Sequence, residues 1–421
     1  MLTPIKKILG DSFYLYLTQG LNYILPFLIL PYLIKTLSAS SFGIFVYSQA
    51  IAQIMLLIVD FGFNISATKE VSLNAEKKDK VTEIYWSINA IKLLFSSVVF
   101  VLVFMFFHLY DPLDSYKEGV TIAGLSVFGS VFFPIWLFQG LGKIKIMALI
   151  SGISKILFLP LIFFFVKDQN DFIPAIIIHT LVQLGAGILA SFYIMRNIDY
   201  RKIRRSFFLK NNLKYYIKDS FPIFLSNSSI SLYTSGITFI LGFFASTAGV
   251  GVYGAIDRIV RVICFGIYGP VSQASFPVLV RLKRESKEKA TKMLRTIFFG
   301  MLAVMSGIII LFLFTQNFII SHYFPELLDY KILLIISILS ILPISLGGVC
   351  GQLGLIALGG EREKKMFSRV YIVVGLSSLV ISYFSIKYWA VSGAVYSVVA
   401  SELFVFTLMF YFVLKRKILF K

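Results

Sequence analysis

Residues 84–107, IYWSINAIKLLFSSVVFVLVFMFF, form an apolar run of 24 residues that decides the fold class. A helix of this length crosses the hydrocarbon core of a bilayer, which needs about 20 predominantly apolar residues. The rest of the chain has the same character, because 58% of the 421 residues are hydrophobic and only 14% are charged. A soluble domain carries about 25% charged residues, so this composition predicts an all-α integral membrane protein.

Eleven further runs of similar length predict that the chain crosses the membrane twelve times. The expected spans cover about 12–34, 42–65, 84–107, 118–140, 147–166, 172–195, 219–244, 248–276, 293–314, 328–351, 366–386 and 389–414. If the N-terminus is cytoplasmic, about 31 Lys and Arg residues lie in cytoplasmic segments and about five lie outside. The positive-inside rule therefore predicts that both termini are cytoplasmic. The net charge of +19 is then a signal of topology, and no nucleic-acid partner is expected.

The chain is predicted to consist of two six-helix bundles, residues 1–195 and 219–421, joined by a basic cytoplasmic linker at 196–218. Residues 11–13 (DSF) recur at 219–221, and the pattern at 43–47 (GIFVY) recurs at 249–253 (GVGVY), at offsets of 208 and 206. Because each half has an even number of spans, the halves share one orientation. They are expected to be related by a pseudo-two-fold axis along the membrane normal and to enclose a cavity.

Polar residues inside the predicted spans are the candidates for function. A charged side chain at the centre of a span costs roughly 2.5–3.5 kcal/mol on insertion scales, so each should face a protein interior or water. These residues are Gln49, Gln53, Asp60, Asn89, Lys92, Lys155, Asp257, Arg258, Arg261 and Glu402. The cations match or outnumber the acids, so the cavity is expected to attract an anion.

Each charged candidate also has a structural interpretation. Lys92 could snorkel to the cytoplasmic surface, as could Lys155, which lies deeper in its span, and Asp60 is expected to end a helix or anchor a loop. Asp257 and Arg261, four residues apart on one helical face, could form an ion pair that only packs helices. Glu402 could carry a proton for ion coupling, as could Asp257, or Glu402 could simply make a hydrogen bond.

Prolines inside the spans are expected to break helices locally. They are Pro26, Pro134, Pro160, Pro343 and the pair Gly269-Pro270. Such kinks are common in membrane helices, and in a transporter they also provide points of bending.

Catalysis is not expected, and neither is a cofactor or a metal site. No phosphate-binding loop, HExxH or GxSxG motif occurs, and the outside loops of about ten to thirteen residues are short for a membrane polymerase or acyltransferase. Cys264 and Cys350 lie in apolar surroundings without a metal-binding pattern, which indicates packing. A transport function remains, including that of a proton- or cation-coupled drug or small-molecule antiporter.

Three segments carry a family resemblance. They are 60–72 (DFGFNISATKEVS), 134–140 (PIWLFQG) followed by Lys143 and Lys145, and 269–277 (GPVSQASFP) followed by Arg281. The chain resembles the Wzx-type polysaccharide flippases, the bacterial O-antigen and capsule repeat-unit translocases of the multidrug/oligosaccharidyl-lipid/polysaccharide exporter superfamily.

This resemblance implies alternating access between two six-helix bundles in the bacterial inner membrane. The implied substrate is an undecaprenyl-diphosphate-linked oligosaccharide, moved from the cytoplasmic to the outer leaflet, and a polysaccharide polymerase and a chain-length regulator are the implied protein partners. Lys92, Lys155, Arg258 and Arg261 suit the diphosphate, whereas Gln49, Gln53 and Asn89 suit the sugar hydroxyl groups.

Overall fold

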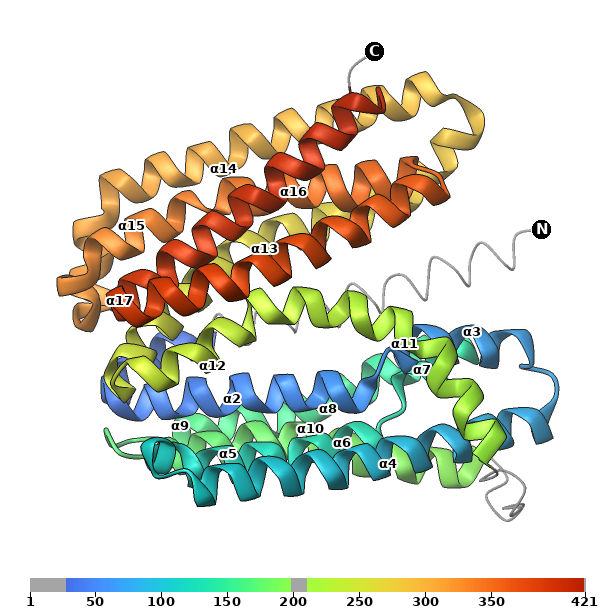
Figure 1. Cartoon of the computed structure of the whole chain (residues 1–421), viewed down its shortest axis with the longest axis horizontal. Coiled ribbons are helices and arrows are strands. Elements are labelled where there is room, and N and C mark those ends of the chain that lie inside the picture. Colours follow the sequence, from blue (N-terminus) through green and yellow to red (C-terminus); the bar gives the residue numbers. More distant parts are fainter. Residues whose placement is uncertain (1–27, 198–209, 420–421) are drawn as a thin grey trace. The chain divides into compact units, whose positions relative to one another are not determined.

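The structure is a computed structural model that describes residues 28–197 and 210–419, and every regular element in these two ranges is a helix (Figure 1). Eight helical runs within them are long and apolar enough to cross a membrane. The all-helical membrane architecture predicted from composition is therefore confirmed for this part of the chain. Most of the predicted first span lies outside the described residues, as does much of the basic linker.

The contacts divide the described residues into two compact units. Unit 1 is Ile44–Ser228, and unit 2 combines residues 28–43 with 229–419. The helix α2 (Ala39–Asp60) begins in unit 2 and continues into unit 1, and α11 (Lys210–Tyr233) begins in unit 1 and ends in unit 2. The division into six-helix bundles at 1–195 and 219–421, with a linker at 196–218, stays a prediction.

In its described part, unit 1 combines four helices of more than 20 residues, α2, α11, α4 (Lys78–Leu109) and α10 (Phe172–Asn197), with shorter helical segments. The shorter segments are α3 (Phe63–Leu73), η1 (Asp111–Tyr116), α5 (Lys117–Gly124), α6 (Ser126–Phe132), α7 (Ile135–Gly140), α8 (Ile144–Phe158), η2 (Leu159–Leu161) and α9 (Ile162–Phe165). The indole of Trp136 is fully buried in its core, packed among side chains from α3 and α4. The segments 60–72 and 134–140 therefore meet inside one unit, where Thr68 of α3 donates a hydrogen bond to the Trp136 carbonyl group.

Unit 2 contains the longest helices. They are α12 (Ser235–Phe244), α13 (Thr247–Glu285), α14 (Lys287–Tyr323), η4 (Pro325–Tyr330), α15 (Lys331–Leu339), α16 (Ile341–Gly348), the π-helix η5 (Val349–Leu358) and α17 (Glu361–Lys415). At 55 residues, α17 would be about 80 Å long if straight, far more than the roughly 30 Å hydrocarbon core. Its backbone is non-helical at Ala390 (φ 45°), and Ser401 beyond this point donates a hydrogen bond to Ser378 before it. The two arms of α17 therefore pack side by side, as the two predicted spans 366–386 and 389–414 require.

The two segments of the internal repeat, 43–47 and 249–253, come into close contact at Gly43 and Gly251. A Cβ atom at Gly43 of α2 would collide with the Thr247 carbonyl oxygen of α13, and one at Gly251 would collide with the Ala39 carbonyl oxygen. Small residues allow this approach, which is how helices pack tightly without a hydrophobic driving force in lipid. Gly43 and Gly251, one from each repeated segment, therefore lie where α2 and α13 touch within unit 2, although Gly251 occupies the repeat position that Phe45 has in the first segment.

Prolines interrupt only some of the helices. Pro134 precedes the first residue of α7, and Pro160 lies in the 3₁₀ turn η2, so these two spans are broken as predicted. The expected break at Gly269-Pro270 is wrong, because α13 continues through both Pro270 and Pro277. A helix of 39 residues can lose single hydrogen bonds at a proline while its remaining turns hold its direction.

Candidate functional site

The charged residues of α13 form an ion pair inside unit 2. The Arg261 Nε atom lies 2.8 Å and 3.0 Å from the two carboxylate oxygens of Asp257, one helical turn away. Both side chains keep about a quarter of their surface exposed, 26% for Arg261 and 24% for Asp257. The predicted pairing on one helical face is therefore present. Because neither group is fully enclosed, an incoming anion could still approach the guanidinium group.

A third ionisable group, Glu402, belongs to the same cluster. Glu402 lies on the second arm of α17, is only 6% exposed, and interacts electrostatically with Arg261 and Asp257. Within the described residues no hydrogen bond to its carboxyl group is found, so the simple hydrogen-bond interpretation has no support there. The hydroxyl groups of Tyr233 and Tyr371 also lie within electrostatic range of Glu402.

Arg258 takes a different direction from Arg261. Its guanidinium carbon lies 5.6 Å from the centre of the Phe42 ring, a cation–π distance. Phe42 belongs to the first turn of α2, so Arg258 contributes to the contact of α2 with α13 inside unit 2. Of the two arginines, Arg261 is the one that forms the ion pair with Asp257.

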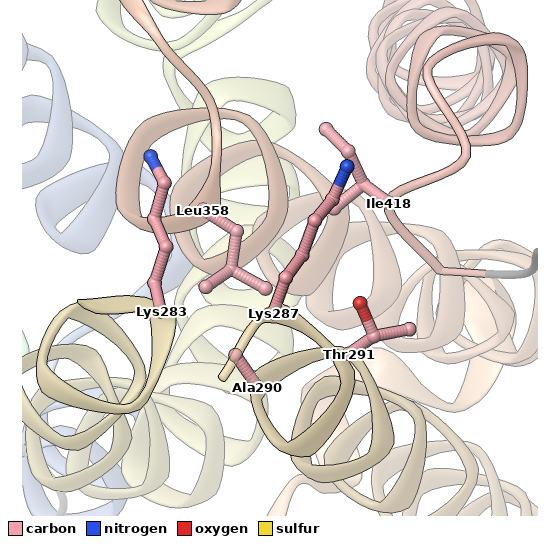
Figure 2. Close-up of a pocket in the computed structure, with 6 residues that line it drawn as sticks. All are labelled: Lys283, Lys287, Ala290, Thr291, Leu358 and Ile418. Carbon is pink, nitrogen blue, oxygen red and sulfur yellow. The ribbon is translucent and has the colours of Figure 1, made fainter. Parts of the chain in front are cut away.

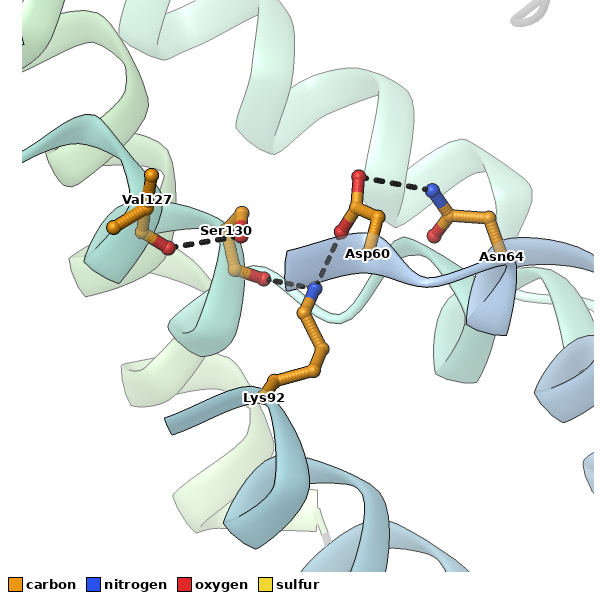
Figure 3. Close-up of polar contacts among 5 residues, drawn as sticks. All are labelled: Asp60, Asn64, Lys92, Val127 and Ser130. Atoms are coloured by element: carbon orange, nitrogen blue, oxygen red, sulfur yellow. Dashed lines mark hydrogen bonds and ion pairs between the residues drawn. The ribbon is translucent and has the colours of Figure 1, made fainter. Parts of the chain in front are cut away.

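A second ion pair lies in unit 1 (Figure 3). Lys92 of α4 is 2% exposed, and its ammonium group donates to Asp60 Oδ1 at 2.7 Å and to the Ser130 carbonyl oxygen at 2.9 Å. Asn64 donates to the other carboxylate oxygen of Asp60 at 3.3 Å. The snorkelling interpretation of Lys92 is therefore wrong, because its ammonium group is held inside the protein by Asp60 and Ser130.

Asp60 is the last residue of α2, which confirms the expected role at a helix end. The chain then turns through two residues with positive φ, Phe61 at 42° and Gly62 at 83°. Gly62 tolerates this left-handed conformation because it has no Cβ atom. A Cβ atom there would also come within 2.9 Å of the Ser220 carbonyl oxygen. The motif 60–72 is thus a fixed corner between α2 and α3.

The remaining predicted residues are spread over unit 1. Asn89 and Lys92 are buried on one face of α4 together with Ser96, as their spacing predicted, and the Asn89 side-chain oxygen has no hydrogen-bond partner among the described residues. Gln49 is half-buried and Gln53 is exposed, both on α2. Lys155 of α8 is half-buried.

The structure adds a polar cluster that the sequence analysis missed. The Gln352 side-chain oxygen, on the π-helix η5, accepts hydrogen bonds from Tyr268 at 3.0 Å and from Ser272 at 3.1 Å, both on α13. The π-helix carries Gln352 beyond the predicted span 328–351, and π-helical turns often mark functional sites. The sequence did contain a signal for this cluster, because Gln352 is a polar residue next to the glycine-rich end of a predicted span.

Cys264 and Cys350 are both buried, and neither forms a disulfide bond. Within the described ranges no group of three or more His, Cys, Asp or Glu side chains could hold a metal ion.

Comparisons with known proteins identify relatives in sequence and neighbours in fold. A family model described as "Polysaccharide biosynthesis protein" matches residues 8–283. A protein of Escherichia coli (strain K12) named "Putative O-antigen transporter" is 31% identical over 413 residues, which is 96% of each chain. A protein of the same name from Shigella dysenteriae is 29% identical over 402 residues, covering 94% of this chain and 97% of its own.

Solved structures share the fold. The lipid II flippase MurJ in an inward closed conformation has a TM-score of 0.72 at 18% identity, covering 98% of this chain and 90% of its own. An inward-facing multidrug resistance MATE family transporter of the MOP superfamily has a TM-score of 0.63 at 15% identity, covering 92% and 94%. At these identities the likeness concerns the fold alone.

Proposed function

Because the chain belongs to the polysaccharide biosynthesis protein family, we propose that it is a flippase for an undecaprenyl-diphosphate-linked oligosaccharide. The substrate would be a repeat unit of an O antigen or capsular polysaccharide, moved from the cytoplasmic to the outer leaflet of the bacterial inner membrane. Near-full-length relatives named as O-antigen transporters support this proposal, and the fold shared with a lipid II flippase is consistent with it. Transport, and not catalysis, is the proposed activity.

The proposed architecture has twelve spans in two six-helix bundles that alternate access, with both termini cytoplasmic. Among the eight apolar helical runs, α17 accounts for two spans because it folds back at Ala390. The seventh span is split between α11 and α12, and the eighth lies in α13, where Asp257, Arg258 and Arg261 raise the charge of the helix. The span near 12–34 completes the set and lies mostly outside the described residues.

One observation carries the site proposal: the ion pair of Arg261 and Asp257, each about a quarter exposed, near the middle of the proposed eighth span. Charges at this depth are costly and are kept mostly for function. We propose that Arg261, with Arg258 and Lys155, attracts the diphosphate, and that Gln49, Gln53 and Asn89 contact sugar hydroxyl groups. Lys92 is held by protein atoms, so its role in this proposal is to position α4 beside α2.

A second candidate is a proton- or cation-coupled small-molecule antiporter of the same superfamily, favoured by the buried carboxyl group of Glu402 near Arg261. In the flippase proposal the same carboxyl group and that of Asp257 serve as ion-coupling residues. The two candidates differ in cargo. Deleting the gene should remove surface polysaccharide and accumulate lipid-linked repeat units inside the cell. Intact surface polysaccharide with lost drug tolerance would support the antiporter.

The arginines are tested by single substitutions in the complemented deletion strain. Arg258→Ala and Arg261→Ala should each stop export at an unchanged membrane level, and Arg261→Lys should partly restore it. If Arg261 and Asp257 only pack helices, removing both should be far milder than removing either one, because no unpaired charge remains. Normal surface polysaccharide in both alanine variants would contradict the proposed binding role.

A further inference from the structure

A small cavity lies between the ends of α13, α14 and η5 in unit 2 (Figure 2). Its volume is about 160 Å³, and it is lined by Lys283, Lys287, Ala290, Thr291, Leu358 and Ile418. Figure 2 shows the two lysine side chains rising on the same side, with Leu358 between them. The lining therefore combines two cationic tips with an apolar floor, and none of its residues carries a carboxylate.

The two lysines differ in how they are held. The Lys283 ammonium group donates to the Gly359 carbonyl oxygen at 2.6 Å, which fixes its position and leaves two N–H groups for another acceptor. Lys287 is exposed and makes no hydrogen bond or ion pair within the described part of the chain. It is also the first residue of α14, where the positive end of the helix dipole adds to its charge.

The chain end forms one wall of this cavity. After α17 the backbone turns at Lys417 (φ 51°), and Ile418 and Leu419 become buried, with Leu419 only 1% exposed. Arg295 of α14 donates two hydrogen bonds to the Leu419 carbonyl oxygen, at 3.2 Å and 3.3 Å. These contacts hold the segment that places Ile418 in the cavity lining.

We propose that this cavity binds the phosphate of an anionic glycerophospholipid, with the glycerol and the start of an acyl chain against Leu358 and Ile418. Lysine clusters at the ends of membrane helices attract lipid phosphates, and an apolar floor suits the glycerol ester region. The volume is below the roughly 300–1,000 Å³ of pockets that hold drug-sized ligands, which favours a headgroup over an oligosaccharide. The site is distinct from the α13 ion pair and does not depend on the proposed export function.

The test measures lipid binding to the purified full-length chain in detergent, by titration with phosphatidylglycerol and native mass spectrometry. Each lysine should contribute about fivefold, the factor that corresponds to the contribution of one basic residue near a lipid surface. Lys287→Gln is therefore expected to weaken binding about fivefold, and the Lys283→Gln/Lys287→Gln pair about 30-fold. Lys287→Arg, which keeps the charge, should bind within about twofold of the unchanged chain.

The matched control is Lys289→Gln/Lys292→Gln, which removes the same charge from exposed positions of α14 outside the cavity lining. Phosphatidylcholine should not bind, and millimolar inorganic phosphate should not displace phosphatidylglycerol. Equal affinity of the double cavity variant, or an equal loss in the control, would overturn the proposal. So would tighter, lysine-dependent binding of undecaprenyl phosphate, which would assign the cavity to the polyprenyl carrier, or displacement by phosphate, which would indicate a simple anion site.

Discussion

The ion pair of Lys92 and Asp60 offers a sharp test, because its two members differ in exposure. Lys92 is 2% exposed, whereas the Asp60 side chain is 31% exposed and also accepts a hydrogen bond from Asn64. Removing one partner of a buried pair costs about 3–5 kcal/mol when the other charge stays buried. Asp60→Asn leaves the ammonium group buried without a counter-ion, with only neutral oxygen acceptors such as the Ser130 carbonyl group, so a cost of this size is expected.

Lys92→Met should cost less than Asp60→Asn. The carboxylate it leaves behind can be hydrated, and methionine fills much of the lysine volume, so about 1 kcal/mol is expected. The double variant leaves no unpaired buried charge and should resemble Lys92→Met. For a unit of this size, about 1 kcal/mol shifts the melting temperature by about 2–4 °C. The expected losses are then about 6–20 °C for Asp60→Asn and about 2–4 °C for the other two variants.

The assay is thermal unfolding of the detergent-purified protein at one fixed scan rate, since unfolding of a membrane protein is commonly irreversible. Asp114→Asn is the matched control, because it breaks an exposed pair with Lys117 that has a similar distance of 2.6 Å. An exposed pair contributes about 0–1 kcal/mol, so this variant should hardly move the transition. Equal losses of melting temperature for Asp60→Asn and Lys92→Met, with the sum of the two losses in the double variant, would refute the coupling between Lys92 and Asp60.

Three further outcomes are expected. Gly251→Val should strongly reduce the amount of folded protein, because any Cβ atom there collides with the α2 backbone. The control Gly300→Val should not reduce it, because open space surrounds that position. Equal amounts of folded protein in the two variants would contradict the close packing. Cysteines at positions 117 and 210 should label from opposite sides of the membrane in intact cells, and labelling from one side would refute the twelve-span topology. Glu402→Gln should keep its membrane level but make export insensitive to a proton uncoupler, and unchanged sensitivity would exclude Glu402 as the coupling residue.

Sequence patterns predicted what depends on neighbours along the chain. The apolar runs located the helices, and the spacing of Asn89, Lys92 and Ser96 correctly placed all three on one buried face of α4. The spacing of Asp257 and Arg261 likewise predicted their ion pair. These inferences hold because helical geometry alone brings residues three, four or seven positions apart onto one face.

What remained hidden depends on packing between distant segments. The partner of Lys92 is 32 positions away, and only the approach of the end of α2 to α4 brings Asp60 within 2.7 Å of its ammonium group. The continuity of α13 through Pro270 was equally hidden, since the local penalty of proline is outweighed by the rest of the helix. The basic cavity requires the chain end to fold back onto α14, which no local pattern indicates.

The two ion pairs differ in the exposure of their charges, which suggests different roles. In unit 1 the Lys92 ammonium group is enclosed, so an anion could reach it only after the pair had separated and left a buried charge, at a cost of several kcal/mol. In unit 2 Arg261 and Asp257 are each about a quarter exposed. Water or a phosphate can therefore replace one partner without leaving the other charge buried and unpaired. Glu402 lies close enough to respond electrostatically when that replacement happens. An exchangeable charge next to a buried carboxyl group suits the proposed anion transport coupled to an ion, which is the argument for proposing the site on α13 and a structural role for the pair at Asp60.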